Sequence, residues 1–460
     1  MVSSIKSYLK KDCESSPLAV YRIAYGLLMF LSILRFWSYG WIEKLYINPI
    51  FHFSYYGFEW IKPIGQLTYL IFIICAISSL LIAIGYKYQI AIITFFLSFT
   101  YIELMDKTTY LNHYYFISIS SFLMIFLPAS AKFSIDSYNK KISYSKIPKW
   151  TIDSIKLLIG LVYFFAGLAK INSDWLLKAM PLKIWLPLKY DIPIIGESLM
   201  HKDWFHYFMS WGGMIYDLSI PFLLLYKKTR VIGFLLVIFF HAFTKILFPI
   251  GMFPYIMIVG ALIFFESNFH NKILTYLSRV INKIKSFFYN KKTEILTKKS
   301  PYGYKTPNLI YIIISVFFLL QILLPFRHIL YPGELFWNEE GYRFSWRVML
   351  MEKIGYTTFK VKNIDTGNSF YVENKEFLTP FQEKQMSFQP DFIIEYAHFL
   401  GKHYKELGNK NISIYADSYV ALNGRRNRQF VDPKVNLLNE KRSLRHYSWI
   451  IPLNDEIKGF

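Results

Sequence analysis

Four polar side chains that could do chemistry lie inside or at the ends of long apolar stretches of this chain. Lys170 follows the apolar run VYFFAGLA, and His241 lies within VIFFHAFTKI. Asn112 and His113 stand in the short polar connection DKTTYLNH at 106–113. An ionisable group at membrane depth is costly unless it is paired or faces water, so these four residues are the candidate site residues.

Lys170 is a candidate general base. Removal from water favours the neutral amine over the ammonium, and a neutral amine can accept a proton near neutral pH. The alternative is structural, because a lysine near the end of a span can extend its ammonium to the membrane surface, with Trp175 as an aromatic anchor beside it. Gly167, one turn earlier, leaves room beside Lys170 and hints at a cavity.

The two histidines allow both functional and structural interpretations. His113 could shuttle a proton, because imidazole changes charge near neutral pH, and Asn112 could hold an oxygen atom of a ligand. The neighbouring Asp106 and Lys107 are expected to pair with each other at a tight turn. His241 is a candidate for binding a ligand, and a histidine bonded to a carbonyl of a neighbouring helix is the alternative.

Other polar residues of the chain do not enter the predicted site. Arg22, near the cytoplasmic end of its span, can extend to the surface, and Asp217 is set aside as a similar case. His398 and His403 are five residues apart and do not share one helical face. No paired-cysteine site, dinucleotide fingerprint or phosphate loop is present, so the sequence predicts no metal.

Membrane helices must position the candidate residues. Hydrophobic residues make up 54% of the chain and aromatic residues 20%. The hydrocarbon core, about 30 Å thick, needs about 20 apolar residues per helix, whose backbone hydrogen bonds are satisfied internally. Nine runs fit this description. They are roughly 18–37, 67–85, 89–105, 114–130, 153–172, 207–226, 230–248, 250–266 and 308–326.

The net charge of +21 reports topology and not nucleic acid binding. Residues 330–460 are nearly balanced, with 18 basic against 16 acidic residues, so the excess lies in the membrane half. With nine spans, every lysine-rich short connection falls on the side of the N-terminus. The positive-inside rule makes that side the cytoplasm, and the odd number of spans places the C-terminal region on the opposite side.

The sequence therefore predicts a polytopic α-helical membrane domain over 1–328 and a soluble, extracytoplasmic, mixed α/β domain over 329–460. Residues 267–306 are interpreted as a basic cytoplasmic linker. Alternating apolar residues predict strands at 342–351, 357–363 and 411–417, and helical spacing predicts a helix at 390–405. The C-terminal domain has no cysteine and hence no disulfide.

Five segments, in this order, resemble signature segments of the vitamin K-dependent γ-glutamyl carboxylase family, including its bacterial members with the horizontally transferred transmembrane domain. They are DKTTYLNH at 106–113, VYFFAGLAK at 162–170 with DW at 174–175, FHAF at 240–243 with GMFPY at 251–255, FSWRVM at 344–349 and FVDPKV at 430–435. Their order and spacing match from about residue 18 to about residue 453.

The resemblance implies an enzyme that oxygenates vitamin K hydroquinone, or menaquinol, with O2 to an epoxide. The strong base so formed removes a γ-proton from a glutamyl residue of a protein or peptide, and CO2 adds to the carbanion. In the family the lysine matching Lys170 deprotonates the hydroquinone, and the histidine matching His113 assists a later proton transfer. Asn112 is carried over as a hydrogen-bonding residue of the active site. His241 is expected to bind the cofactor, although the polar residues that follow it differ from those of the animal enzymes.

The composition, rich in Lys, Ile, Tyr and Asn, is typical of bacteria, so the expected location is a bacterial inner membrane. Membrane lipids are expected partners and nucleic acids are not. The chain ends soon after SWIIP at 448–452, which leaves recognition of a propeptide open. Two other functions remain: a relative that oxygenates or binds quinols without carboxylation, and a non-enzymatic transporter, for which the sequence shows no paired halves.

Overall fold

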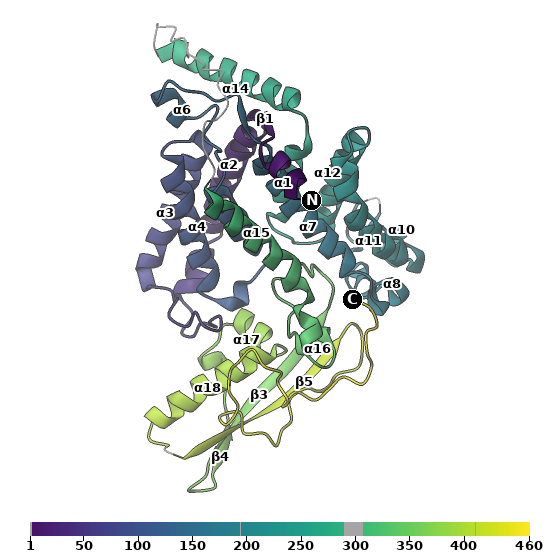
Figure 1. The fold of residues 1–460 in the computed structure, drawn as a ribbon. Coiled ribbons are helices and arrows are strands. Elements are labelled where there is room, and N and C mark those ends of the chain that lie inside the picture. The colour runs from purple at the N-terminus through teal and green to yellow at the C-terminus, as the bar shows by residue number, and fades with distance from the viewer. Residues whose placement is uncertain (1, 194, 289–306, 410) are drawn as a thin grey trace.

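The computed structural model describes residues 2–193, 195–288, 307–409 and 411–460 of the chain. Helices form the upper part of the molecule, and a smaller domain that contains a sheet lies below them (Figure 1). The C-terminus lies beside α8 (Ser173–Lys178), where the two parts meet. The division into residues 1–328 and 329–460 stays a prediction.

Within the described residues, six helices are long and apolar enough to cross a membrane. They are built on α2 (Ser16–Ser38), α3 (Thr68–Ile84), α7 (Lys149–Leu168), α11 (Asp203–Leu225), α12 (Arg230–Leu247) and α15 (Asn308–Leu323). Shorter helices α4 (Tyr88–Leu104), α5 (Asn112–Ile125) and α13 (Phe253–Ala261) occupy the other three predicted runs. The chain is a membrane helical protein, and the count of nine spans stays a prediction.

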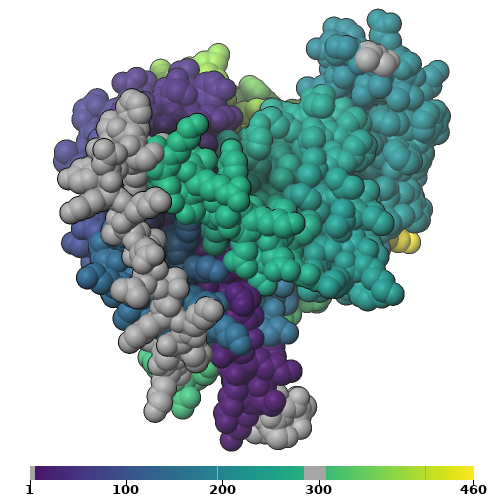
Figure 2. Space-filling view, turned by 90° about the horizontal axis from the view of Figure 1, so that it is seen from above, coloured from purple at the N-terminus to yellow at the C-terminus, as the bar shows by residue number. Residues whose placement is uncertain are grey.

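The bundle has two sides. Seen from above, α3 and α4 in purple and blue lie on one side, and α11 and α12 in teal lie on the other (Figure 2). Arg22 of α2 is fully buried and donates to the carbonyls of Ile82 and Ala83, each at 2.9 Å. The expectation that Arg22 extends to the surface is therefore wrong, because its guanidinium binds the buried carbonyls at the end of α3.

The linker predicted over 267–306 is a helix in its first half. Helix α14 (Ser267–Phe288) is bent by 115° from the end of α13 and crosses the top of the molecule (Figure 1). Its apolar residues Ile273 and Leu274 pack against Ala19 and Val20 of α2. The spacing of these apolar residues explains the helix, which buries one face and leaves basic residues outside. Residues 289–306 lie outside the described residues.

The C-terminal domain has an antiparallel sheet in the order β4-β3-β5-β6. The strands are β3 (Lys353–Asn363), β4 (Ser369–Tyr371), β5 (Ile412–Leu422) and β6 (Arg428–Gln429). Helices α17 (Pro380–Met386) and α18 (Pro390–Glu406) lie on one side of it (Figure 1). The predicted helix and the two predicted strands within β3 and β5 are confirmed.

The strand predicted at 342–351 is wrong. Phe344, Trp346 and Met349 have positive φ angles of 62°, 59° and 53°, which no strand accommodates. Successive residues here contact different parts of the molecule, and Trp346 and Arg347 are each 1% exposed. Ser345, Trp346 and Arg347 are buried in succession, so burial does not follow the alternation of apolar residues in the sequence. Such left-handed residues cost about 1–3 kcal/mol each and persist where the surroundings fix them.

Candidate active site

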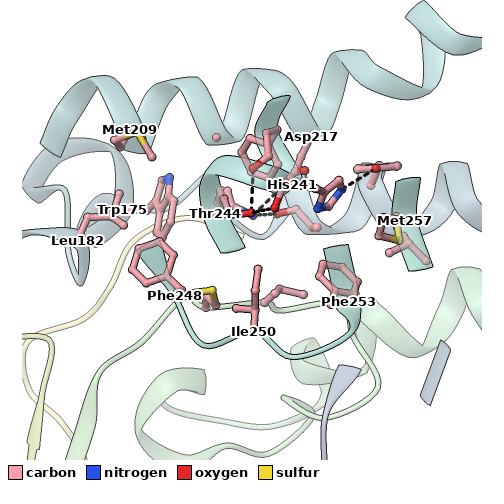
Figure 3. A pocket seen from close by; sticks show the side chains of 18 of the residues that line it. Trp175, Leu182, Met209, Asp217, His241, Thr244, Phe248, Ile250, Phe253 and Met257 are labelled. Atoms are coloured by element: carbon pink, nitrogen blue, oxygen red, sulfur yellow. Dashed lines mark hydrogen bonds and ion pairs between the residues drawn. The ribbon is translucent and has the colours of Figure 1, made fainter. Parts of the chain in front are cut away.

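An apolar cavity of about 90 Å³ lies between α7, α11 and α12, at the end of the bundle that meets the C-terminal domain. Large apolar side chains form most of its wall: Trp175, Trp185, Met209, Phe240, Phe248, Phe253 and Met257. Val348 and Met349 of the C-terminal region complete it. In Figure 3, Asp217, His241 and Thr244 face a common space, with Phe248, Ile250 and Phe253 across from them.

Lys170 lies in the turn that joins α7 to α8 and lines this cavity. Its Nζ donates to Asp217 Oδ2 at 2.7 Å and to the Ala166 carbonyl at 3.1 Å. The two side chains of the pair are only 8% and 7% exposed. Lys170 therefore does not extend to the membrane surface, and the alternative of an ammonium at that surface is wrong, while the catalytic role stays a prediction.

The room beside Lys170 comes from Gly213 of α11 and not from Gly167. A Cβ at Gly213 would stand 3.9 Å from Lys170 Cε and 3.8 Å from Trp175 Cζ2, at ordinary van der Waals distance, so this position has room for a methyl group. A Cβ at Gly167 would stand only 2.8 Å from Leu218 Cγ. Gly167 therefore serves close packing of α7 on α11, and the hint of a cavity at that glycine was wrong.

His241 lines the same cavity as Lys170 and is 2% exposed. Its Nε2 shares a hydrogen bond of 2.9 Å with the Tyr163 hydroxyl. Its Nδ1 is buried and has no hydrogen-bond partner among the described residues. A buried polar atom without a partner is costly, so Nδ1 is a position where a ligand atom would be stabilised.

His113 is buried but does not line this cavity. Its ring lies 6.0 Å from the ring of Phe253, and Phe253 lies 5.7 Å from the ring of His241 on the cavity side. Gly251, with a φ of +61°, has the left-handed backbone conformation that favours glycine, and it lies beside His113. The structure thus brings Lys170 and His241 together and places His113 one aromatic ring away.

Asn112 holds the irregular segment that closes the cavity. Its Nδ2 donates to the Arg347 carbonyl at 3.2 Å, and its Oδ1 accepts from the Tyr110 hydroxyl at 3.1 Å. Val348 and Met349, which follow directly, line the cavity. Asn112 therefore positions a wall of the site.

The C-terminal domain holds the Lys170 turn from outside. Asp174 of α8 accepts from Arg425 at 2.6 and 2.9 Å and from Asn423 at 2.9 Å. Burial opposes ionisation of Asp174, but the hydrogen bonds from Arg425 and Asn423 hold its pKa below the usual range. The Ser173 amide donates to the Lys458 carbonyl at 2.7 Å, and the Phe460 amide donates to the Ile171 carbonyl at 2.9 Å.

The connection at 106–113 makes the second contact with the C-terminal domain. Lys107 lies 2.7 Å from Asp391 and 3.4 Å from Glu395, both in α18. The expected pairing of Lys107 with Asp106 is therefore wrong, because carboxylates distant in sequence lie closer to the ammonium. Burial opposes ionisation of Asp391, but the charges of Arg343 and Lys107 lower its pKa.

The arrangement suits removal of a proton from an apolar ligand. Two full charges in a medium of low dielectric are costly unless they are paired, and the amine of Lys170 lies 2.7 Å from the carboxylate of Asp217. Aromatic walls exclude water around that amine. No cluster of three or more His, Cys, Asp or Glu side chains suited to a metal ion occurs in the part of the chain that the structure describes.

Two residues of this site were missed by sequence reasoning. Asp217 was set aside, although an acid inside an apolar run requires a buried partner, and Lys170 was the available cation. Tyr163 lies in the VYFFAGLAK motif, seven residues before Lys170. Nothing in the sequence distinguishes its hydroxyl from those of the other 35 tyrosines.

Comparison with known families agrees with this architecture. The HTTM domain matches residues 10–269, a range that contains all four candidate residues. The vitamin K-dependent gamma-carboxylase lumenal domain matches residues 306–456, which contain the sheet and the irregular segment at the cavity wall. No solved structure matches the chain. The resemblance predicted from five short segments is confirmed, and the chain belongs to the vitamin K-dependent γ-glutamyl carboxylase family.

Proposed function

We propose that this protein carboxylates glutamyl residues of a protein or peptide and couples this reaction to epoxidation of vitamin K hydroquinone or menaquinol, with O2 and CO2. The observation that carries the proposal is the buried Lys170–Asp217 pair, 2.7 Å long, in an aromatic cavity that both family domains line. Lys170 is the proposed base, and Asp217 is the proposed acceptor of the proton that Lys170 holds at rest.

The residues of the cavity fit an aromatic quinol. Its walls carry the rings of Trp175, Phe240 and Phe253, which suit a flat apolar ligand. Lys170 would take the proton of one hydroxyl, and the unpartnered His241 Nδ1 would bond the other oxygen. When bound, the quinol supplies, by its reaction with O2, a base strong enough to remove a γ-proton of glutamate, which no side chain can do.

Roles for the remaining candidates follow from their positions. His113 would move a proton at a later stage, from behind Phe253. Asn112 would act by holding the cavity wall at Arg347. His113 would thus act on a proton of the reaction, whereas Asn112 would act only on the shape of the site.

We further propose that the N-terminus is cytoplasmic and that the C-terminal domain lies outside a bacterial inner membrane. The lysine-rich connections support this orientation. Packing of the C-terminal domain against the Lys170 turn supports it as well, because an exported substrate would then approach the site directly.

The test uses the purified full chain in lipid nanodiscs with vitamin K hydroquinone, O2, labelled bicarbonate and a glutamate-containing peptide. The expected result is label in the peptide together with epoxide. Epoxide without label would reject the carboxylase function and favour quinol oxygenation alone. Absence of both products would reject the proposal altogether.

A further inference from the structure

A second cavity, of about 430 Å³, lies between the membrane helices and the C-terminal domain. Leu104 and Leu324, at the ends of α4 and α15, line its membrane side. The irregular segment contributes to both cavities, since Phe344 lines the second cavity and Met349 lines the first. Both residues have a positive φ, a strained backbone conformation for residues other than glycine.

The lining of the second cavity has an excess of basic groups. It contains five basic residues, Lys107, Arg327, Arg343, Arg442 and Arg445, against three acidic ones, Glu339, Glu340 and Asp391. Each of the acidic residues already has a basic partner. Glu339 binds Lys353 at 2.9 Å, Glu340 binds His446 at 2.8 Å, and Asp391 binds Lys107 and Arg343.

Two guanidinium groups at this cavity remain without a carboxylate. Across the described ranges, neither Arg327 nor Arg445 is within ion-pair distance of an acidic side chain, and Arg327 Nη2 binds only the Arg343 carbonyl. The Tyr55 hydroxyl also lines the cavity, is buried and has no partner in the same ranges. Arg327 and Tyr55 both approach the Phe344 ring, at 5.7 and 6.1 Å.

These donors fit a carboxylate. Arginine binds carboxylates in a planar two-pronged geometry, and a tyrosine hydroxyl can donate to the same group. Most of the lining belongs to residues 331–447 of the C-terminal domain, and apolar groups such as Phe58, Phe344 and Leu444 alternate with the charged ones. Three of the five basic residues, Arg343, Arg442 and Arg445, belong to that domain and not to the membrane helices, which favours an acidic peptide over a lipid.

We propose that this second cavity binds an acidic segment of the peptide substrate, with Arg327 and Tyr55 holding one of its carboxylates. The proposal rests on the proposed function for the identity of the peptide. It assigns a binding site for the glutamates next to the one undergoing reaction, in a cavity that the irregular segment links to the Lys170 cavity. Binding there is expected to weaken with salt, because guanidinium–carboxylate attraction is screened.

The test measures direct binding of a fluorescent peptide that contains several glutamates to the purified full chain, and of the same peptide with glutamine in their place. We expect the glutamate peptide to bind at least tenfold more tightly. Arg327→Gln should remove most of this difference, and Arg327→Lys should keep part of it. Arg428→Gln, on the exposed strand β6, is the matched control and should leave binding and activity unchanged.

Several outcomes would overturn the assignment. Equal binding of both peptides, or Arg327→Gln binding as wild type does, excludes the cavity as a carboxylate site. If Arg327→Gln loses both the preference for the glutamate peptide and thermal stability, Tyr55→Phe is measured as a second variant. Tyr55→Phe should weaken binding of the glutamate peptide and leave binding of the glutamine peptide unchanged. If vesicles of phosphatidylglycerol displace the glutamate peptide and this displacement depends on Arg327, the cavity is a lipid site instead.

Failure of the proposed function is distinguishable, because binding is measured without turnover. Arg327-dependent binding without labelled product would reject the carboxylase activity and keep the cavity assignment. Labelled product together with peptide binding that does not depend on Arg327 would reject the cavity assignment and keep the carboxylase activity.

Discussion

The turn at Lys170 and the connection at 106–113 are both polar interruptions of apolar sequence at the same end of the bundle, but their polar groups face different partners. Lys170 turns into the bundle and pairs with Asp217 of a neighbouring helix. Lys107 and Asn112 turn toward the C-terminal domain, where they bind Asp391 and the Arg347 carbonyl.

The difference separates two uses of buried polarity. A pair enclosed by aromatic walls holds a proton where a ligand can reach it, whereas a pair between domains fixes one part of the molecule on the other. We therefore expect changes at the first region to affect the reaction and changes at the second to affect mainly geometry and stability.

The largest expected effect is that of Lys170→Ala. Loss of a general base removes about 10²–10⁴-fold in rate, and both products should fall together because the base acts before the two reactions diverge. Lys178→Ala, eight residues further on and half exposed, is the control and should keep activity. Labelled peptide and epoxide are measured in parallel.

Removal of Lys170 also leaves Asp217 buried without its cation, which can cost about 3–5 kcal/mol in stability. The double variant Lys170→Met with Asp217→Asn removes both charges and should restore the melting temperature without restoring either product. If this double variant has activity near the wild-type level, Lys170 has a structural role and is not the base.

Asp217→Asn should lower both products by about 100-fold, within the range of a proton-transfer group. An amide keeps a hydrogen bond to Lys170 but cannot take its proton. The prediction is checked by kcat and the KM for the hydroquinone, measured separately. A rise in KM with unchanged kcat would show that Asp217 only shapes the cavity.

His113→Ala tests the boundary between the two regions. Because His113 lies behind Phe253, its loss should lower carboxylation by about tenfold and epoxidation by less, since epoxide formation precedes the step assigned to His113. The ratio of labelled peptide to epoxide is the measurement. An equal loss of both products would instead place His113 with Lys170 at the first proton transfer.

The sequence predicted those features that local patterns determine. Apolar runs predicted the membrane helices, and periodicity predicted α18 and the cores of β3 and β5. The partners of Lys107 and Lys170 escaped prediction because Asp391 and Asp217 are 284 and 47 residues away. The segment 342–351 misled because its apolar residues alternate in the sequence, whereas positive φ angles at Phe344, Trp346 and Met349 break the strand and burial does not alternate.

The smallest effect on the reaction is expected for a substitution of Asp106. Protonation of this carboxyl makes the stability of the folded chain depend on pH. Burial raises its pKa to about 7, against hydrogen bonds from Thr108 and Gln382. Since the folded state binds this proton more tightly than the unfolded chain does, the contribution of Asp106 is complete below about pH 4 and is lost as the pH rises through 7.

Asp106→Asn should therefore keep activity near neutral pH. Between about pH 4 and 7 the free energy of unfolding should fall further for the wild type than for this variant, by on the order of a few kcal/mol. The melting temperature of the variant should accordingly fall less over the same range. Asp391 has the opposite sign, because its lowered pKa gives a contribution that is present above about pH 4 and lost in acid. Melting temperatures of the wild type and of Asp106→Asn across this range separate the two groups. If both proteins lose stability in parallel from pH 4 to 7, the charge of Asp106 is not the cause, and Asp106 contributes to the domain contact only through its hydrogen bond from Gln382.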